Sequence, residues 1–295
     1  MPQSYPPEPG PSMPAGPARR RRRLTDEETG RRMLDTALAM VHRDGLTVGL
    51  DHLGFEDVIR DAGVSRAAVY RRWPYKDLFF GDLLRELAGG AAPASAPALE
   101  TTREVLGSVL AARAGDLATP EGRHDVITEL LRVTAVSDFE AVHGSAEWRT
   151  YLALQATFLS LSEGALRADV QAALARSEQR FVERVAHGWE AVATALGYRP
   201  RPGTGGGFPL IATLACAAMR GLVLMALPEP GLLDRRVPAN PTGASAAADW
   251  SLLGLAAAGL AVTYLEPDPD VTWDDARLAA LTGSGLTRAR TEPGS

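Results

Sequence analysis

The segment that decides the fold lies at residues 62–78 and reads AGVSRAAVYRRWPYKDL. Gly63 supplies the backbone freedom that a tight turn needs, and Ser65 is a residue type that caps helix N-termini. A short helix is therefore predicted over residues 66–72. The preceding stretch, residues 55–62, carries apolar residues at i, i+3, i+4 and i+7 and predicts another short helix. Two short helices joined by a three-residue turn follow from these signals.

Longer helices are predicted on both sides of this pair. Thr25 and Glu28 have the spacing of a capping box, in which each side chain bonds the other's backbone amide. The helix that begins there is expected to end at Gly45. Pro74 cannot continue the helix before it, and a new apolar stripe begins near Lys76. Residues 24–89 are thus predicted to form an N-terminal three-helix, helix-turn-helix domain, followed by a linker.

The second helix of the pair has the chemistry of a DNA reader. Its first turn would face base edges in the major groove, where Arg66 suits a bidentate contact with guanine and Ala67 permits close approach. Tyr70 and Lys76 suit phosphates, while Val69 and Trp73 are expected to face the core. The predicted DNA-binding residues are Ser65, Arg66, Ala67, Tyr70, Arg71, Arg72 and Lys76.

Residues 34–83 resemble the DNA-binding region of the TetR family of bacterial transcription regulators. The Gly-Val-Ser turn, Tyr70, the aromatic Trp73 and Lys76 carry the resemblance. The resemblance implies an all-helical homodimer with a C-terminal effector domain, which binds a palindromic duplex and represses until a small molecule releases it. Two positions depart from the pattern: Gly54 and Ala68 stand where hydroxyl residues commonly contact phosphate. The arginine charge would then have to compensate, which predicts strong salt dependence.

Charge is distributed unevenly over the 295 residues. The whole chain has a net charge of −5, but residues 19–89 carry 13 arginines and one lysine against 12 acidic residues, a net of +2. Residues 1–23 are predicted to be a disordered tail that ends in a run of five arginines, Arg19–Arg23. This run is either a solvated charge cluster or an arm that binds phosphates or enters a minor groove.

The rest of the chain is expected to be helical, so the predicted fold class is all-α. A helical effector-binding and dimerisation domain is predicted over residues 98–268, followed by a polar tail over 269–295. Its helices are expected at about 100–114, 122–136, 145–163, 167–197, 208–227 and 248–265, with loops at 203–207 and 228–243 and an optional short helix near 273–281.

Two sites are expected in this second domain. The helices over 167–197 and 208–227 resemble the pair that forms the dimer interface in the TetR family, although they could instead be internal core. An unknown, largely apolar effector is expected to bind among aromatic side chains and two polar groups on apolar faces. The predicted ligand-binding residues are Trp148, Tyr151, Gln155, Phe158, His187 and Trp189.

The sequence leaves two alternative functions. A helical enzyme or carrier is disfavoured, because Glu183 and His187 share a helix face but are too few for a metal site, and the lone cysteine, Cys216, lies in an apolar helix. No cofactor, metal or catalytic residue is expected. A membrane-tethered regulator would use residues 208–227, but Arg220 lies inside that stretch. The expectation is a cytoplasmic protein without a membrane partner.

Overall fold

The computed structural model describes residues 24–44, 53–90 and 96–282, and this part of the chain is mostly helical. The N-terminal helices are α1 (Asp26–Asp44), α2 (Phe55–Ala62), α3 (Arg66–Arg72) and α4 (Lys76–Gly90). The others are α5 (Ala96–Ala112), the 3-10 helix η1 (Ala114–Ala118), α6 (Pro120–Gly144), α7 (Ala146–Leu159), α8 (Ala165–Ala195), α9 (Gly207–Ala226), α10 (Gly231–Asp234), α11 (Leu252–Tyr264) and α12 (Asp275–Thr282). The expected predominance of helices is confirmed.

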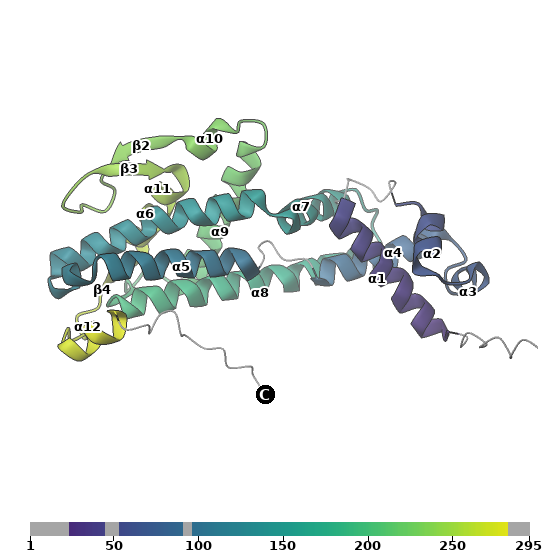
Figure 1. The fold of residues 1–295 in the computed structure, drawn as a ribbon, viewed down its shortest axis with the longest axis horizontal. Coiled ribbons are helices and arrows are strands. Elements are labelled where there is room, and N and C mark those ends of the chain that lie inside the picture. Colours follow the sequence, from purple (N-terminus) through teal and green to yellow (C-terminus); the bar gives the residue numbers. More distant parts are fainter. Residues whose placement is uncertain (1–23, 45–52, 91–95, 283–295) are drawn as a thin grey trace, which may run out of the picture.

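The long helices α5, α6 and α8 run lengthwise beside one another, and α1 to α4 gather at one end of the molecule (Figure 1). α9 packs on α8 and on α11, and α11 in turn packs on α6. The two ends are joined mainly by α4, which packs along α8, and by α7, which contacts both α1 and α4. The N-terminal helices are therefore attached to the larger helical body through side-chain packing.

One hydrophobic cluster runs through this junction. It combines buried residues of α1, α2 and α4, such as Met33, Val58 and Leu83, with Leu154 of α7 and Val170 of α8. Three further clusters fill the larger body. Because the first cluster draws on both ends, the N-terminal helices do not have a core entirely of their own.

The helix caps and the turn glycine that the sequence predicts are confirmed. The backbone N–H of Thr25 donates to Glu28 Oε2 at 2.7 Å, and the N–H of Glu28 donates to Thr25 Oγ1 at 3.1 Å. Gly63 adopts the left-handed conformation, with φ of 63°. The N–H of Ala68 donates to Ser65 Oγ at 3.2 Å, so Ser65 caps α3. These interactions fix the start of α1 and the turn between α2 and α3.

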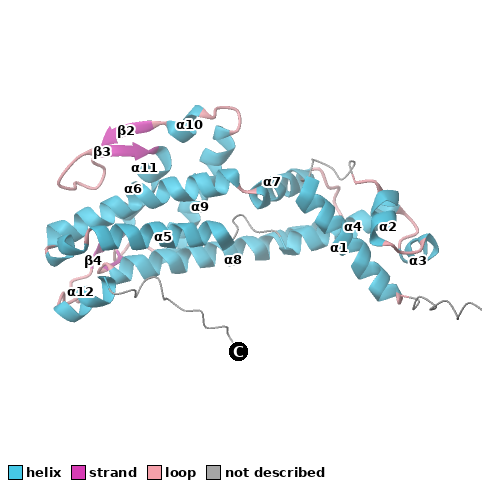
Figure 2. Ribbon diagram, in the orientation of Figure 1, coloured by secondary structure: helices cyan, strands magenta, loops and turns pink. Residues whose placement is uncertain are grey.

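Within the described residues, four short strands depart from the all-helical expectation (Figure 2). They form two antiparallel pairs, in which β1 pairs with β4 and β2 pairs with β3. Their bounds are β1 (Tyr198–Pro200), β2 (Arg236–Ala239), β3 (Ala248–Ser251) and β4 (Leu265–Pro267). Residues 228–243, expected to be a loop, therefore contain α10 and β2, and the helix expected from 248 begins only at Leu252.

Other boundaries also differ. α6 continues to Gly144 rather than ending near 136, and α4 extends to Gly90, one residue past the predicted end of the N-terminal domain. In the expected tail, Leu281 of α12 is buried in a cluster with residues of α5 and α6, so this segment belongs to the packed body. The expectations for residues 1–23, for the helix end at Gly45, for the linker from 91 to 95 and for the end from 283 lie outside the described residues.

Candidate nucleic-acid interface

α3 has a buried side and an exposed side. Val69 is 0% exposed and Trp73 is 2% exposed, as expected for the packing side. The Trp73 ring meets Phe79 of α4 edge to face, with ring centroids 5.1 Å apart. This packing holds α3 by one face and leaves the other face exposed to solvent.

The seven predicted contact residues all lie on the exposed surface of α3 and at the start of α4. The side chain of Arg66 is 73% exposed, and Tyr70 is 43% exposed. An open groove of about 530 Å³ runs beside them, from the start of α2 to the start of α4. It is lined by Gly54, Phe55, Glu56, Tyr70, Pro74, Tyr75, Lys76 and Asp77. The structure thus brings Tyr70 and Lys76 into one surface depression.

Glu56 of α2 already binds two of the predicted DNA-contact residues, Arg66 and Tyr70. Its Oε2 lies 2.8 Å from Nη2 of Arg66, and its Oε1 accepts a hydrogen bond of 2.9 Å from the Tyr70 hydroxyl. This hydrogen bond raises the pKa of Tyr70. The sequence alone does not reveal this partner, because Glu56 lies on α2 while Arg66 and Tyr70 lie on α3.

The other cationic residues among the predicted DNA contacts are Arg71, Arg72 and Lys76, and they have different partners. Arg71 forms an ion pair with Asp26 in the first turn of α1, and this contact raises the pKa of Arg71. The guanidinium carbon of Arg72 lies 5.0 Å from the centre of the Trp73 ring. Within the described residues, Arg72 and Lys76 have no carboxylate partner. Lys76 lines the groove, whereas the Arg72 guanidinium packs over Trp73 and against Gly30 of α1, so Lys76 is the better placed of the two for a phosphate in the groove.

For a DNA duplex bound at this surface, replacing Glu56 with glutamine is expected to strengthen binding by roughly threefold to tenfold, since an exposed ion pair is worth about 0–1 kcal/mol and a repulsive charge is removed. Glutamine keeps the size of the side chain but frees Arg66 from the ion pair. Fluorescence anisotropy with a labelled duplex measures the change, and Glu86→Gln on the exposed side of α4 is the control. A weaker complex would instead mean that Glu56 positions Arg66 for its contact.

The two departures from the TetR pattern have different surroundings. Gly54 precedes α2 and provides no side-chain cap. A Cβ at this position would collide with Asp57 Oδ2, so a hydroxyl residue there requires the Asp57 side chain to move. Ala68 is half-buried in α3 and offers no donor. Neither position carries a side-chain hydroxyl that could donate to a phosphate.

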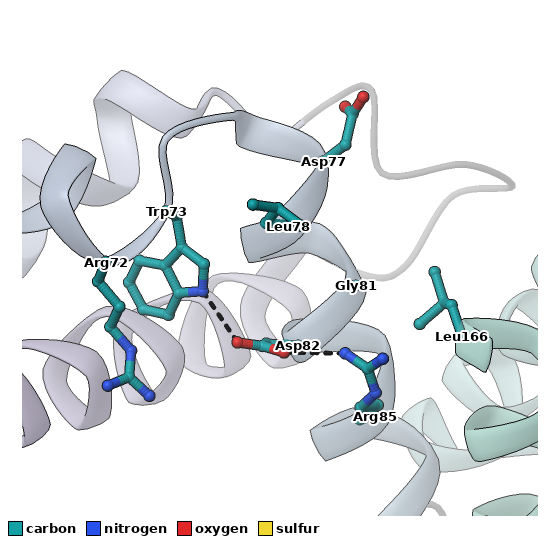
Figure 3. A pocket seen from close by; sticks show the side chains of 8 residues that line it. All are labelled: Arg72, Trp73, Asp77, Leu78, Gly81, Asp82, Arg85 and Leu166. Atoms are coloured by element: carbon teal, nitrogen blue, oxygen red, sulfur yellow. Dashed lines mark hydrogen bonds and ion pairs between the residues drawn. The ribbon is translucent and has the colours of Figure 1, made fainter.

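A chain of polar contacts connects α3 with α8. The indole Nε1 of Trp73 donates to Asp82 Oδ2 at 2.9 Å, and Arg85 Nη1 donates to Asp82 Oδ1 at 2.9 Å (Figure 3). Arg85 Nε also donates to Asp169 Oδ2 of α8 at 2.9 Å. Trp73, Asp82 and Arg85 border a cavity of about 350 Å³, whose other lining residues are Arg72, Asp77, Leu78, Gly81 and Leu166. The contacts make the position of α3 depend on α8.

The structure does not gather all six predicted ligand-binding residues at one place. Trp148 and Tyr151 are buried and stacked, with ring centroids 5.6 Å apart, and Gln155 contacts Tyr151. Phe158 packs instead against the cluster of the N-terminal helices. Two residues of α8 lie elsewhere: Trp189 packs in a third cluster and His187 is exposed. Of the six residues, only Trp148, Tyr151 and Gln155 of α7 lie close to one another.

Arg220 of α9 and Glu178 of α8 complete that neighbourhood, and the sequence analysis identified neither of them as a site residue. Arg220 Nη1 lies 2.7 Å from Glu178 Oε1, and the Tyr151 hydroxyl donates to Glu178 Oε2 at 2.9 Å. Burial raises the pKa of Tyr151 to about 12, so its hydroxyl stays protonated at neutral pH. The signal that could have revealed this cluster was an arginine inside an apolar helix, which requires a charged partner.

Several features bear on the alternative functions. In the described part of the chain, no group of three or more histidine, cysteine or acidic residues could hold a metal ion. Burial raises the pKa of Cys216 to about 11, so the thiolate is scarce at neutral pH. Among the described helices, α9 alone is long and apolar enough to cross a membrane. α9 also packs on α8 and α11, and a helix packed inside a protein can have the same composition.

Comparison with known proteins gave no relative: no family model, no curated protein and no solved structure matches this chain.

Proposed function

We propose that this chain is a sequence-specific DNA-binding transcription regulator that resembles the TetR family. Its reader would be the α2–turn–α3 unit, which acts as a helix-turn-helix. The observation that carries the proposal is the division of α3: Val69 and Trp73 are buried, while Arg66, Ala67 and Tyr70 are exposed. A helix held by one face can present the other to base edges in the major groove.

The groove beside α3 supports a role for phosphate contacts. Lys76 begins α4 and lines the groove together with Tyr70. A helix N-terminus favours an anion, because its first backbone N–H groups are unpaired and the helix dipole is positive there. Tyr70 must release Glu56 before its hydroxyl can donate to a phosphate. Most of the binding energy would then come from charge, which makes affinity fall steeply with salt.

Selection of duplexes from a random library tests this function directly. The expected result is enrichment of a palindromic motif, since a twofold dimer places two readers on two half-sites. Recovery of no common motif would overturn the proposal. Genomic footprinting would then locate the operator and the regulated genes.

Two substitutions separate base reading from phosphate binding. Arg66→Ala is expected to cost about 1–3 kcal/mol and to relax sequence preference at the base it contacts. Lys76→Ala is expected to weaken binding to all duplexes and to lower the salt slope by about one. Anisotropy titrations on the selected site and on single-base variants measure both effects. Equal loss on every duplex with Arg66→Ala would show that Arg66 does not read a base.

The proposal extends to regulation and assembly. We infer a cytoplasmic homodimer that represses until a small molecule bound by the helical body releases it. The contacts of α4 and α7 with both ends of the molecule offer a route by which ligand binding could move the reader. The exposed face of α9 offers a surface for the second copy.

Two alternatives remain distinguishable. A helical enzyme or carrier would turn over or transport a ligand, and Arg66→Ala on the exposed side of α3 would leave that activity unchanged. A membrane-tethered regulator would use α9, the one described helix with the required length and composition. Recovery of the protein in the soluble fraction without detergent would exclude that alternative.

A further inference from the structure

Three buried N–H donors lie around Tyr151 and have no hydrogen-bond acceptor within the described residues. They are Nε and Nη2 of Arg220 and Nε1 of Trp148. Both side chains contact the same tyrosine: the Trp148 ring stacks on it, and the guanidinium carbon of Arg220 lies 5.5 Å from its ring centre. Buried donors are normally satisfied, because leaving them unpaired costs free energy.

The two free donors of Arg220 form one edge of its planar guanidinium group. The opposite corner, Nη1, is held by Glu178 at 2.7 Å, and Glu178 is held in turn by the Tyr151 hydroxyl. The ring of Phe181 lies 5.7 Å from the guanidinium carbon and flanks it together with Tyr151. The orientation of the free edge is therefore fixed before any partner arrives, which lowers the cost of binding.

We propose that this edge of Arg220 binds a carbonyl oxygen of a neutral, largely apolar small molecule. The free groups are all donors, so the partner must be an acceptor. The charge of Arg220 is already balanced by Glu178, and a carboxylate or phosphate would add an uncompensated negative charge to a buried site. A neutral carbonyl avoids this cost and suits the surrounding aromatic rings.

Binding at this edge requires α7 to move. The free Arg220 nitrogens are covered by protein atoms, and Tyr151 is one of the side chains that flank them. One turn further along α7, Leu154 is fully buried in the cluster that also holds the N-terminal helices. Displacement of α7 would therefore disturb the packing of α1 and α4. The role of this molecule as the effector of a regulator rests on the proposed function. The binding of the molecule to Arg220 does not depend on that function.

Nuclear magnetic resonance of the full-length, ¹⁵N-labelled protein tests the site with four matched probes. Acetophenone is neutral and carries an acceptor, benzoate is anionic, benzylamine is cationic, and ethylbenzene has no acceptor. We expect acetophenone to shift the Arg220 Nε–H signal saturably and to move the Trp148 indole signal. The other three probes should act at least about tenfold more weakly. Trp148→Phe assigns the indole signal among the five tryptophans.

Two variants make the result specific. Arg220→Lys keeps a positive charge for Glu178 but loses the two-donor edge, so acetophenone binding should weaken at least about tenfold. Arg176→Lys, on the exposed surface of α8, is the matched control and should change nothing. Stronger binding of benzoate, equal binding of ethylbenzene, or no response to any probe would each overturn the proposal. The titration contains no DNA, so its failure is separate from failure of the proposed DNA binding.

Discussion

Ala217→Glu is expected to convert the proposed dimer into monomers and to weaken binding to a palindromic duplex by at least about 100-fold. Ala217 lies on a face of α9 that is exposed and uncharged, together with Thr213, Gly221 and Leu224. Three further large apolar side chains are about half exposed. Met225 at the end of α9 is 56% exposed, Leu227 just after α9 is 54% exposed, and Val262 on α11 is 47% exposed. Apolar surface of this kind favours association with another protein surface.

The size of the effect follows from charge burial. In a twofold interface each substitution occurs twice, so two carboxylates would be taken out of water near each other. Burying an unpaired charge costs several kcal/mol, and about 1.4 kcal/mol changes an equilibrium constant tenfold. Because Ala217 is exposed in the single chain, the fold of each protomer should be unaffected. DNA affinity falls because a monomer contacts only one half-site.

Sedimentation equilibrium and anisotropy measure the two parts of this prediction. Ala111→Glu, an exposed alanine on α5, introduces the same charge away from α9 and should leave both quantities unchanged. A dimer that survives Ala217→Glu with its affinity intact would place the second copy on another surface. A wild-type chain that is soluble only in detergent would favour the membrane alternative for α9.

Features encoded by neighbouring residues were predictable from the sequence. The capping pair Thr25 and Glu28, the left-handed Gly63 and the cap Ser65 all depend on contacts within three or four residues. The bounds of α2 and α3 followed from these signals and were correct to the residue. The buried positions Val69 and Trp73 also followed, since an amphipathic helix reveals its inner face through its periodicity.

The small sheets were missed because their pairing is not local. β2 contains Pro238 and has only four residues, and its partner β3 lies beyond the loop from 240 to 247. That loop is held by α6, since His124 Nε2 lies 3.0 Å from the carbonyl oxygen of Thr242. No pattern within either strand identifies its partner. β1 and β4 are still further apart, with α9 and α11 between them in the sequence.

The candidate site shows the same limit at the level of side chains. The sequence predicted which residues of α3 are exposed, but it could not show that Glu56 holds both Arg66 and Tyr70, since Glu56 comes from another helix. Likewise Arg220 was considered only as a charge that disfavours a membrane span. Its pairing with Glu178 requires α8 and α9 to be packed together. The sequence therefore predicts where the helices lie along the chain, but not which side chains meet between helices.

Trp73→Ala is expected to lower the free energy of unfolding by about 3–5 kcal/mol, the range typical of removing a buried large aromatic side chain. Trp73 is 2% exposed, lies at the C-terminal end of α3 and packs against Phe79. Its cluster also contains Leu154 of α7 and Val170 of α8. The loss should therefore lower the midpoint of one cooperative transition rather than unfold the N-terminal helices alone. Urea denaturation followed by circular dichroism measures the change.

Trp73→Phe separates packing from the polar chain that leads to α8. Phenylalanine keeps an aromatic ring against Phe79 but removes the indole N–H that donates to Asp82, while Asp82 keeps its bond from Arg85. The expected cost is about 1–2 kcal/mol, the value of a hydrogen bond to a charged acceptor plus a small loss of packing. Trp273→Phe, beside α12, is a control that should leave DNA affinity unchanged.

If Trp73→Phe leaves stability intact but weakens DNA binding, the Trp73–Asp82 bond positions α3 rather than stabilising the fold. If Trp73→Ala costs less than about 1 kcal/mol, Trp73 is not the packing anchor of α3.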